Sequence, residues 1–168
     1  MLFRSKTTVG EALAERLGLP FADSDHIVEG QAGMSVSDIF VTEGESAFRV
    51  READAVARAL TDFSGVLALG GGAILNAETR ERLRGHRVVW LTVGLSEACR
   101  RVGLNVSRPL LLGNVRGTLM KLMEERAPLY AEVATLTVAT DDMSVDDVVD
   151  ALVAATDMAD AAVTRDMP

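Results

Sequence analysis

The composition is typical of one globular domain. The chain has 168 residues, of which 48% are hydrophobic and 25% charged, which suffices for a single core. Its net charge of -8 provides no long-range attraction to nucleic acid or anionic membrane, because both are polyanions. The single cysteine, Cys99, excludes an internal disulfide and a thiolate metal cluster, and no apolar run approaches the roughly 20 residues that span a bilayer. We therefore expect a cytoplasmic protein with neither nucleic acid nor membrane as partner.

Hydrophobic periodicity predicts helices that alternate with strands. The predicted helices lie at residues 8–17, after a cap at Ser35, and at 45–60, 77–83, 96–102, 115–126 and 144–155. The predicted strands lie at residues 20–22, 65–69, 88–93 and 136–139. We expect Ser96 to cap its helix and Pro128 to mark the end of the helix that begins at Val115. The alternation predicts an α/β fold, with a doubly wound parallel sheet and flanking helices.

Two segments are predicted to be loops. Residues 103–113 carry Arg108 and Pro109 between two glycines, which indicates a mobile loop over a site. The last residues, 156–168, lack apolar periodicity, so they are predicted to form a flexible tail. A single domain is therefore expected over residues 1–155.

Lys6 and Thr7 stand directly before the first predicted helix. They match the last two positions of a G-x-x-x-x-G-K-[ST] phosphate loop, in which the lysine reaches the β- and γ-phosphates and the hydroxyl holds Mg²⁺. Ser5 replaces the second glycine of that pattern, and the first would fall before Met1. Taken alone, a Lys-Thr pair marks only a helix start.

Polar or small residues follow two of the predicted strands. Asp23-Ser24-Asp25 follows the first strand, and Gly70-Gly71-Gly72, here called the glycine loop, follows the second. Ligands of open α/β sheets bind at such carboxyl edges, and glycines let a ligand approach the backbone closely. The alternatives are a solvated acidic turn and a flexible turn. Arg49 lies three residues before Glu52 in a predicted helix. Taken alone, this spacing predicts only an ordinary surface ion pair.

The order of these segments resembles the shikimate kinase family from about Lys6 to about Ala155. Its other matching segments are Asp38-Ile39-Phe40, Glu43-Gly44-Glu45, Phe48-Arg49, Arg108-Pro109-Leu110-Leu111 and Arg126-Ala127-Pro128-Leu129-Tyr130. The resemblance implies a P-loop kinase of adenylate-kinase-like fold that transfers the γ-phosphate of ATP, with Mg²⁺, to the 3-hydroxyl of shikimate. It also implies a monomer.

Individual roles follow only from the resemblance. It implies catalysis by Asp23, Lys6 and Arg108, and metal binding by Thr7 and Asp23. ATP would contact Lys6, Thr7, Thr8, Arg101 and Arg108. Shikimate would contact Asp25, Arg49, Gly70, Gly71, Gly72 and Arg126, with Arg49 and Arg126 acting as a carboxylate clamp because the guanidinium fork pairs with a carboxylate. Phe40 and Phe48 resemble apolar pocket walls, although core packing explains them equally well.

The pattern departs from the family at the amino end. The family's first strand, which lies in the middle of a five-stranded sheet and leads into the phosphate loop, has no counterpart, so we expect an amino-terminally truncated member with impaired activity. A non-catalytic protein that still binds shikimate is an alternative. A kinase of another small hydroxylated metabolite is a further alternative, although it would not need this set of motifs together.

Overall fold

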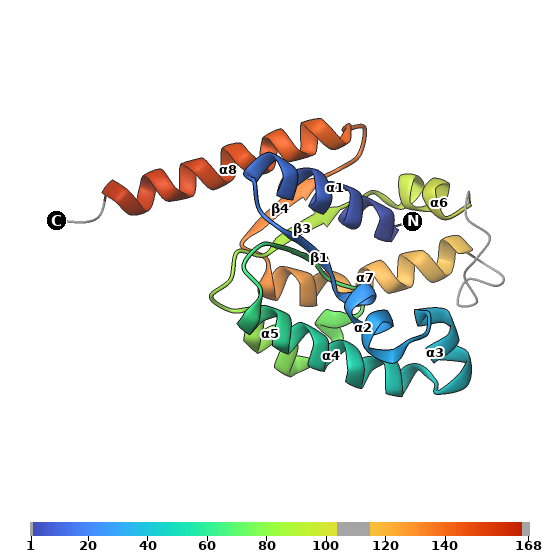
Figure 1. The fold of residues 1–168 in the computed structure, drawn as a ribbon. Helices are drawn as coiled ribbons and strands as arrows, with labels where there is room; N and C mark the ends of the chain where they lie inside the picture. Colours follow the sequence, from blue (N-terminus) through green and yellow to red (C-terminus); the bar gives the residue numbers. More distant parts are fainter. Residues whose placement is uncertain (1, 104–114, 166–168) are drawn as a thin grey trace.

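Helices surround two short pairs of parallel strands (Figure 1). The computed structural model describes residues 2–103 and 115–165, with side chains for 6–100 and 116–156. The helices are α1 (Leu2–Leu17), α2 (Ser24–Ala32), α3 (Val36–Thr42), α4 (Glu45–Asp62), α5 (Ala77–Leu83), α6 (Leu95–Gly103), α7 (Val115–Val133) and α8 (Val145–Arg165), with a 3-10 turn, η1, at Ala73–Leu75. The strands are β1 (Phe21–Asp23), β2 (Val66–Ala68), β3 (Val89–Thr92) and β4 (Leu136–Ala139).

The strands form two separate parallel sheets. β1 pairs with β2, so that Ala22 lies opposite Leu67, and β3 pairs with β4, so that Leu91 lies opposite Val138. Among the residues that the structure describes, no strand connects β2 to β3. Parallel strands linked by helices confirm the predicted α/β class. The two unconnected pairs agree with the expectation that one central strand has no counterpart.

Helices cover both faces of the strands. Figure 1 shows α1 and α8 together on one side, and α4, α5 and α7 on the other. On the first side, Val9 of α1 packs with Leu152 of α8 and with Leu91 of β3. On the second side, Ile74, Leu83 and Val133 form a buried cluster against which Leu69, just after β2, and Val88, just before β3, are packed. These two apolar clusters hold the strand pairs between the helical layers.

A further cluster supports the helices beside the acidic motif. It consists of Val28, Ile39, Phe48 and Ala55, from α2, α3 and α4, with Phe40 packed against it. The rings of Phe40 and Phe48 lie 4.9 Å apart between centroids, and Phe48 is 3% exposed. Core packing therefore accounts for Phe48 and stabilises the end of α4 that carries Arg49.

Two predicted serine caps are confirmed and one is wrong. Ser35 Oγ accepts the Asp38 backbone N–H at 3.1 Å, and Ser144 Oγ accepts the Asp147 N–H at 3.1 Å. By contrast, α6 begins at Leu95, and the Gly94 carbonyl accepts the first N–H bond, from Ala98. Ser96 therefore lies inside α6 and does not cap it.

Three predicted helix boundaries also change. α7 continues through Pro128 to Val133, because residues beyond the proline, including Val133, are packed in the core and offset the missing N–H bond. α8 continues to Arg165, past the predicted end near Ala155 and into the predicted tail. α1 begins at Leu2, so Lys6 lies inside the helix instead of before it. The predicted mobile loop at 103–113 lies almost wholly outside the described residues.

The described helices include no candidate membrane span. None combines the length and the apolar character that crossing a bilayer requires.

Candidate active site

Asp23 joins the end of β1 to the start of α2. It is the N-cap of α2, and its Oδ1 accepts the Asp25 backbone N–H at 2.9 Å. Its Oδ2 accepts the Thr7 hydroxyl of α1 at 2.8 Å. Ser24 between the two acids is fully buried. The alternative of a solvated acidic turn is therefore wrong, because hydrogen bonds fix the Asp23 carboxylate at a buried helix start and the Asp25 carboxylate is partly buried beside it.

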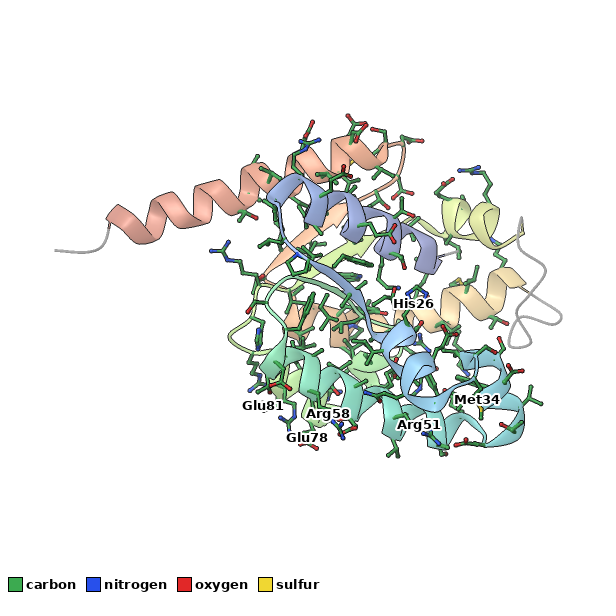
Figure 2. All side chains as sticks on the ribbon, viewed as in Figure 1. His26, Met34, Arg51, Arg58, Glu78 and Glu81 are labelled. Carbon is green, nitrogen blue, oxygen red and sulfur yellow. The ribbon has the colours of Figure 1, made fainter. Side chains whose placement is uncertain are left out.

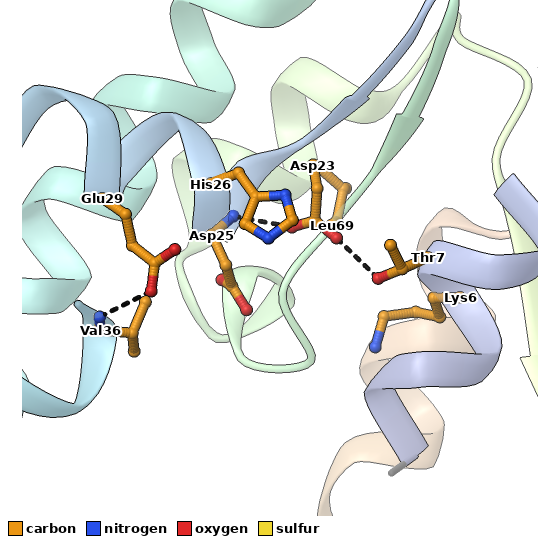
Figure 3. A pocket seen from close by; sticks show the side chains of 8 residues that line it. All are labelled: Lys6, Thr7, Asp23, Asp25, His26, Glu29, Val36 and Leu69. Atoms are coloured by element: carbon orange, nitrogen blue, oxygen red, sulfur yellow. Dashed lines mark hydrogen bonds between the residues drawn. The ribbon is translucent and has the colours of Figure 1, made fainter. Parts of the chain in front are cut away.

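These residues line a pocket of about 220 Å³ between α1 and α2 (Figure 3). Its lining consists of Lys6, Thr7, Asp23, Asp25, His26, Glu29, Val36 and Leu69. Lys6 extends from α1 into the space that Asp25 faces from the opposite side (Figure 3). The structure thus brings together the phosphate-loop pair and the acidic motif, which are distant in sequence.

Asp25 is held in an environment that disfavours its charge. Burial, followed by the charges of Asp23 and Glu52, raises the pKa of Asp25 from 3.8 to about 6. Its Oδ1 is buried and has no hydrogen-bond donor among the described residues. Glu52 Oε1 is in the same situation, and Glu52 is 2% exposed. A polar ligand that donates hydrogen bonds would satisfy either oxygen.

The glycine loop lies against both carboxylates. A β-carbon on Gly70 would collide with Glu52 Oε1 and come within 2.8 Å of Asp25 Oδ1, so both unpaired oxygens converge on this one residue. The Gly70 N–H donates to the buried Ser24 Oγ at 2.8 Å. Gly70 therefore supplies close approach, whereas its amide is already used to join the glycine loop to α2.

The two arginines of the predicted carboxylate clamp reach successive glycines of this loop. Arg126 Nη1, from α7, donates to the Gly71 carbonyl oxygen at 2.9 Å. A β-carbon on Gly72 would collide with the Arg49 guanidinium, from α4. The structure thus brings two cations from different helices to one loop. A flexible turn does not describe this loop, because Ser24, Arg126 and Arg49 contact it from three elements.

Ion pairs hold Arg49 in place. Its Nη1 lies 2.7 Å from Glu52 Oε2 and its Nη2 lies 3.0 Å from Glu45 Oε1. Its guanidinium carbon stands 5.2 Å from the centroid of the Phe48 ring. Burial lowers the pKa of Arg49, but its bonds to Glu52 and Glu45 outweigh burial and raise it overall, so Arg49 is always charged. Arg49 is therefore a fixed cation beside the glycine loop, and the ordinary surface pair is the wrong interpretation.

Several site predictions are not tested by this geometry. Arg108 lies outside the described residues, and only the backbone of Arg101, in α6, is described. Thr8 is exposed and is not among the residues that line the pocket. Lys6 and Thr7 lie past the first four residues of α1, so their backbone N–H groups fall within the range of intrahelical bonding. Their side chains reach the pocket, but their backbone amides do not form an anion cradle.

Sequence reasoning missed four contributors to the site. The sequence predicted only a surface ion pair for Glu52 and only a place in the acidic motif for Ser24. It predicted no role for His26, although His26 lines the pocket. Tyr130 belongs to a matched motif, and its hydroxyl donates to the Gly71 carbonyl oxygen at 2.7 Å. The helical spacing of four residues from Arg126 could have placed Tyr130 beside the same loop.

Comparisons with known proteins agree with this geometry. The family model described as shikimate kinase matches residues 5–157. The chain belongs to the shikimate kinase family. A shikimate kinase from Thermobifida fusca is 58% identical over 135 residues, which cover 80% of this chain and 78% of that relative. A shikimate kinase from Streptomyces coelicolor is 49% identical over 156 residues, covering 93% and 91%.

Solved structures show the same fold. A shikimate kinase from Acinetobacter baumannii, solved in complex with shikimate, superposes with a TM-score of 0.83 at 36% identity and covers 97% of this chain and 89% of its own. A Bacteroides thetaiotaomicron shikimate kinase superposes with a TM-score of 0.79 at 26% identity, covering 89% and 90%. The predicted shikimate kinase family and P-loop kinase fold are confirmed.

Proposed function

We propose that this chain phosphorylates the 3-hydroxyl of shikimate with ATP and that the acceptor binds at the glycine loop, next to the pocket that Lys6, Asp23 and Asp25 line. The supporting observation is the convergence of Arg49, Arg126 and Asp25 on the glycine loop. Two guanidinium groups suit a carboxylate, and an unpaired buried carboxylate oxygen suits a hydroxyl. Shikimate carries both groups. Membership of the shikimate kinase family supports the same assignment.

The residues of the site have distinct roles in this proposal. Arg49 and Arg126 hold the substrate carboxylate, and Asp25 accepts a hydrogen bond from a substrate hydroxyl. Asp23 accepts the proton of the reacting hydroxyl as its oxygen bonds to the γ-phosphorus and the bond to ADP breaks. Lys6 neutralises charge on the phosphates. Arg108, assigned by resemblance alone, would add a second cation there.

The donor set near Asp23 fits Mg²⁺. Thr7 and Asp23 offer a hydroxyl and a carboxylate 2.8 Å apart, and Mg²⁺ typically takes one or two protein oxygens besides phosphate and water. When bound, Mg²⁺ would neutralise phosphate charge. We further propose a monomer located in the cytoplasm.

A second candidate function is shikimate binding without turnover. It is favoured by the position of Lys6 and Thr7 inside α1, where their amides do not form an anion cradle. Both candidates use the same acceptor site, so they differ only in nucleotide chemistry.

A coupled ADP-release assay on the purified chain distinguishes the candidates. The proposed function predicts ADP release that requires both shikimate and MgATP and is lost in Asp23→Asn. Asp54→Asn, which removes an exposed carboxylate paired with Arg58 on α4, is the matched control and keeps its activity. Shikimate binding without ADP release would support the second candidate, and a folded chain that shows neither would refute both.

A further inference from the structure

Arg126 and Tyr130 donate to the same atom. Arg126 Nη1 lies 2.9 Å and the Tyr130 hydroxyl 2.7 Å from the Gly71 carbonyl oxygen. The two residues are four apart in α7, so their side chains leave the same face of the helix. A carbonyl oxygen has two lone pairs, and these two donors occupy both. The Gly71 carbonyl therefore remains hydrogen-bonded if either donor leaves.

Packing fixes the Tyr130 ring. It stacks on Trp90 of β3, with ring centroids 5.5 Å apart and an angle of 19° between the planes. It also packs against the buried cluster of Ile74, Leu83 and Val133. Burial is the largest influence on its phenol and raises the pKa, so the hydroxyl remains protonated and able to donate. Tyr130 is thus a rigid donor, whereas Arg126 is attached through a long side chain.

We propose that Tyr130 is a positioning residue for the carboxylate clamp, because its hydroxyl keeps the Gly71 carbonyl oxygen paired when Arg126 turns its guanidinium to the substrate carboxylate. The inference rests on the proposed function, in which shikimate is the ligand. With Arg126 as sole donor, each turn toward the carboxylate would leave a partly buried carbonyl without a partner. Tyr130 removes that penalty, because its hydroxyl still donates to the carbonyl oxygen.

The test is the affinity of Tyr130→Phe for shikimate and for its uncharged methyl ester, measured by calorimetry. We expect about fivefold to tenfold weaker shikimate binding, because one buried hydrogen bond must be given up each time Arg126 engages the carboxylate. Ester affinity should change less than about twofold. In an Arg126→Ala background, Tyr130→Phe should have no further effect, since no clamp movement remains. Thr156→Val is the matched control, because it also removes a hydroxyl that donates to a backbone carbonyl, 2.9 Å away on Leu152 of α8.

The sole tyrosine permits a second measurement that needs no substitution. Tyr130 is the only tyrosine in the chain, so uniform labelling with 3-fluorotyrosine reports on this residue alone. Shikimate should shift the ¹⁹F resonance, because Arg126 leaves the Gly71 oxygen and Tyr130 remains its only donor. The methyl ester should not shift the resonance.

Three outcomes would overturn the inference. Unchanged shikimate affinity in folded Tyr130→Phe would show that the second donor has no role in the clamp. Equal losses for shikimate and the ester would indicate a purely structural tyrosine, as would a ¹⁹F shift that is the same for both ligands. A folded wild-type chain that fails to bind shikimate would instead refute the proposed function itself.

Discussion

Asp25 is expected to lower the stability of the free protein, although the proposed function needs its carboxylate to bind shikimate. Its pKa rises from 3.8 in the unfolded chain to about 6 in the folded one, because of burial and the charges of Asp23 and Glu52. Between about pH 4 and pH 6 the folded state binds more protons than the unfolded state, so stability falls as the pH rises through this window. At about 1.4 kcal/mol per pKa unit, the carboxylate lowers the free energy of unfolding by on the order of 2–3 kcal/mol above pH 6.

Replacing Asp25 with asparagine removes this charge and supplies a missing donor. The new amide can reach Glu52 Oε1, since that oxygen and Asp25 Oδ1 converge on Gly70 and neither is paired. Asp25→Asn should therefore raise the free energy of unfolding at pH 8 by about 1–3 kcal/mol, while shikimate affinity falls at least about tenfold.

Urea denaturation at several pH values measures the stability effect. The gain of Asp25→Asn over wild type should shrink below pH 6 and disappear at about pH 3, where the wild-type carboxyl is protonated in both states. Asp54→Asn is the control, because Asp54 is exposed on α4 and pairs with Arg58. It should change stability by less than about 0.5 kcal/mol. A variant less stable than wild type at pH 8, or a gain that does not depend on pH, would refute the reasoning.

Three further predictions follow from the same contacts. Gly72→Ala should displace the Arg49 guanidinium and weaken shikimate binding at least about tenfold, and calorimetry that shows unchanged affinity would contradict this. Ser24→Ala should lower the free energy of unfolding by about 1–3 kcal/mol, because the buried Gly70 N–H loses its acceptor, and a change below about 0.5 kcal/mol would argue against that bond. Shikimate affinity should be about tenfold lower at pH 5 than at pH 7.5, because Asp25 takes up a proton near pH 6, and a flat titration between these values would exclude Asp25 as the hydroxyl acceptor.

Local sequence patterns predicted most of the elements because they depend on neighbouring residues. The caps at Ser35 and Ser144 and the apolar strand β2 needed no knowledge of distant contacts. The end of α7 could not be predicted in this way. A proline such as Pro128 disfavours helix continuation, because it lacks a backbone N–H. Here the burial of Val133 in the core stabilises the helix beyond the proline.

The site also contains residues whose place the sequence predicted and residues whose place it did not. The resemblance to shikimate kinases implied one acceptor site for Asp25, Arg49 and Arg126, and the structure brings each of them to the glycine loop. The burial of Glu52 was not predictable, because a Glu three residues after an Arg on a helix has the same spacing whether it is exposed or fully enclosed. Its environment depends on the approach of the glycine loop from another element.

The most direct test of the account is calorimetric titration of the wild-type chain and two arginine variants with shikimate. Arg126→Ala removes a guanidinium at the glycine loop, whereas Arg58→Ala removes one on the outer face of α4 (Figure 2). We predict that the wild-type chain binds shikimate, that Arg126→Ala weakens binding about 30-fold or more, and that Arg58→Ala stays within about twofold of wild type. A folded wild-type chain without affinity for shikimate, or equal losses in both variants, would contradict the central claim that the acceptor site lies at the glycine loop.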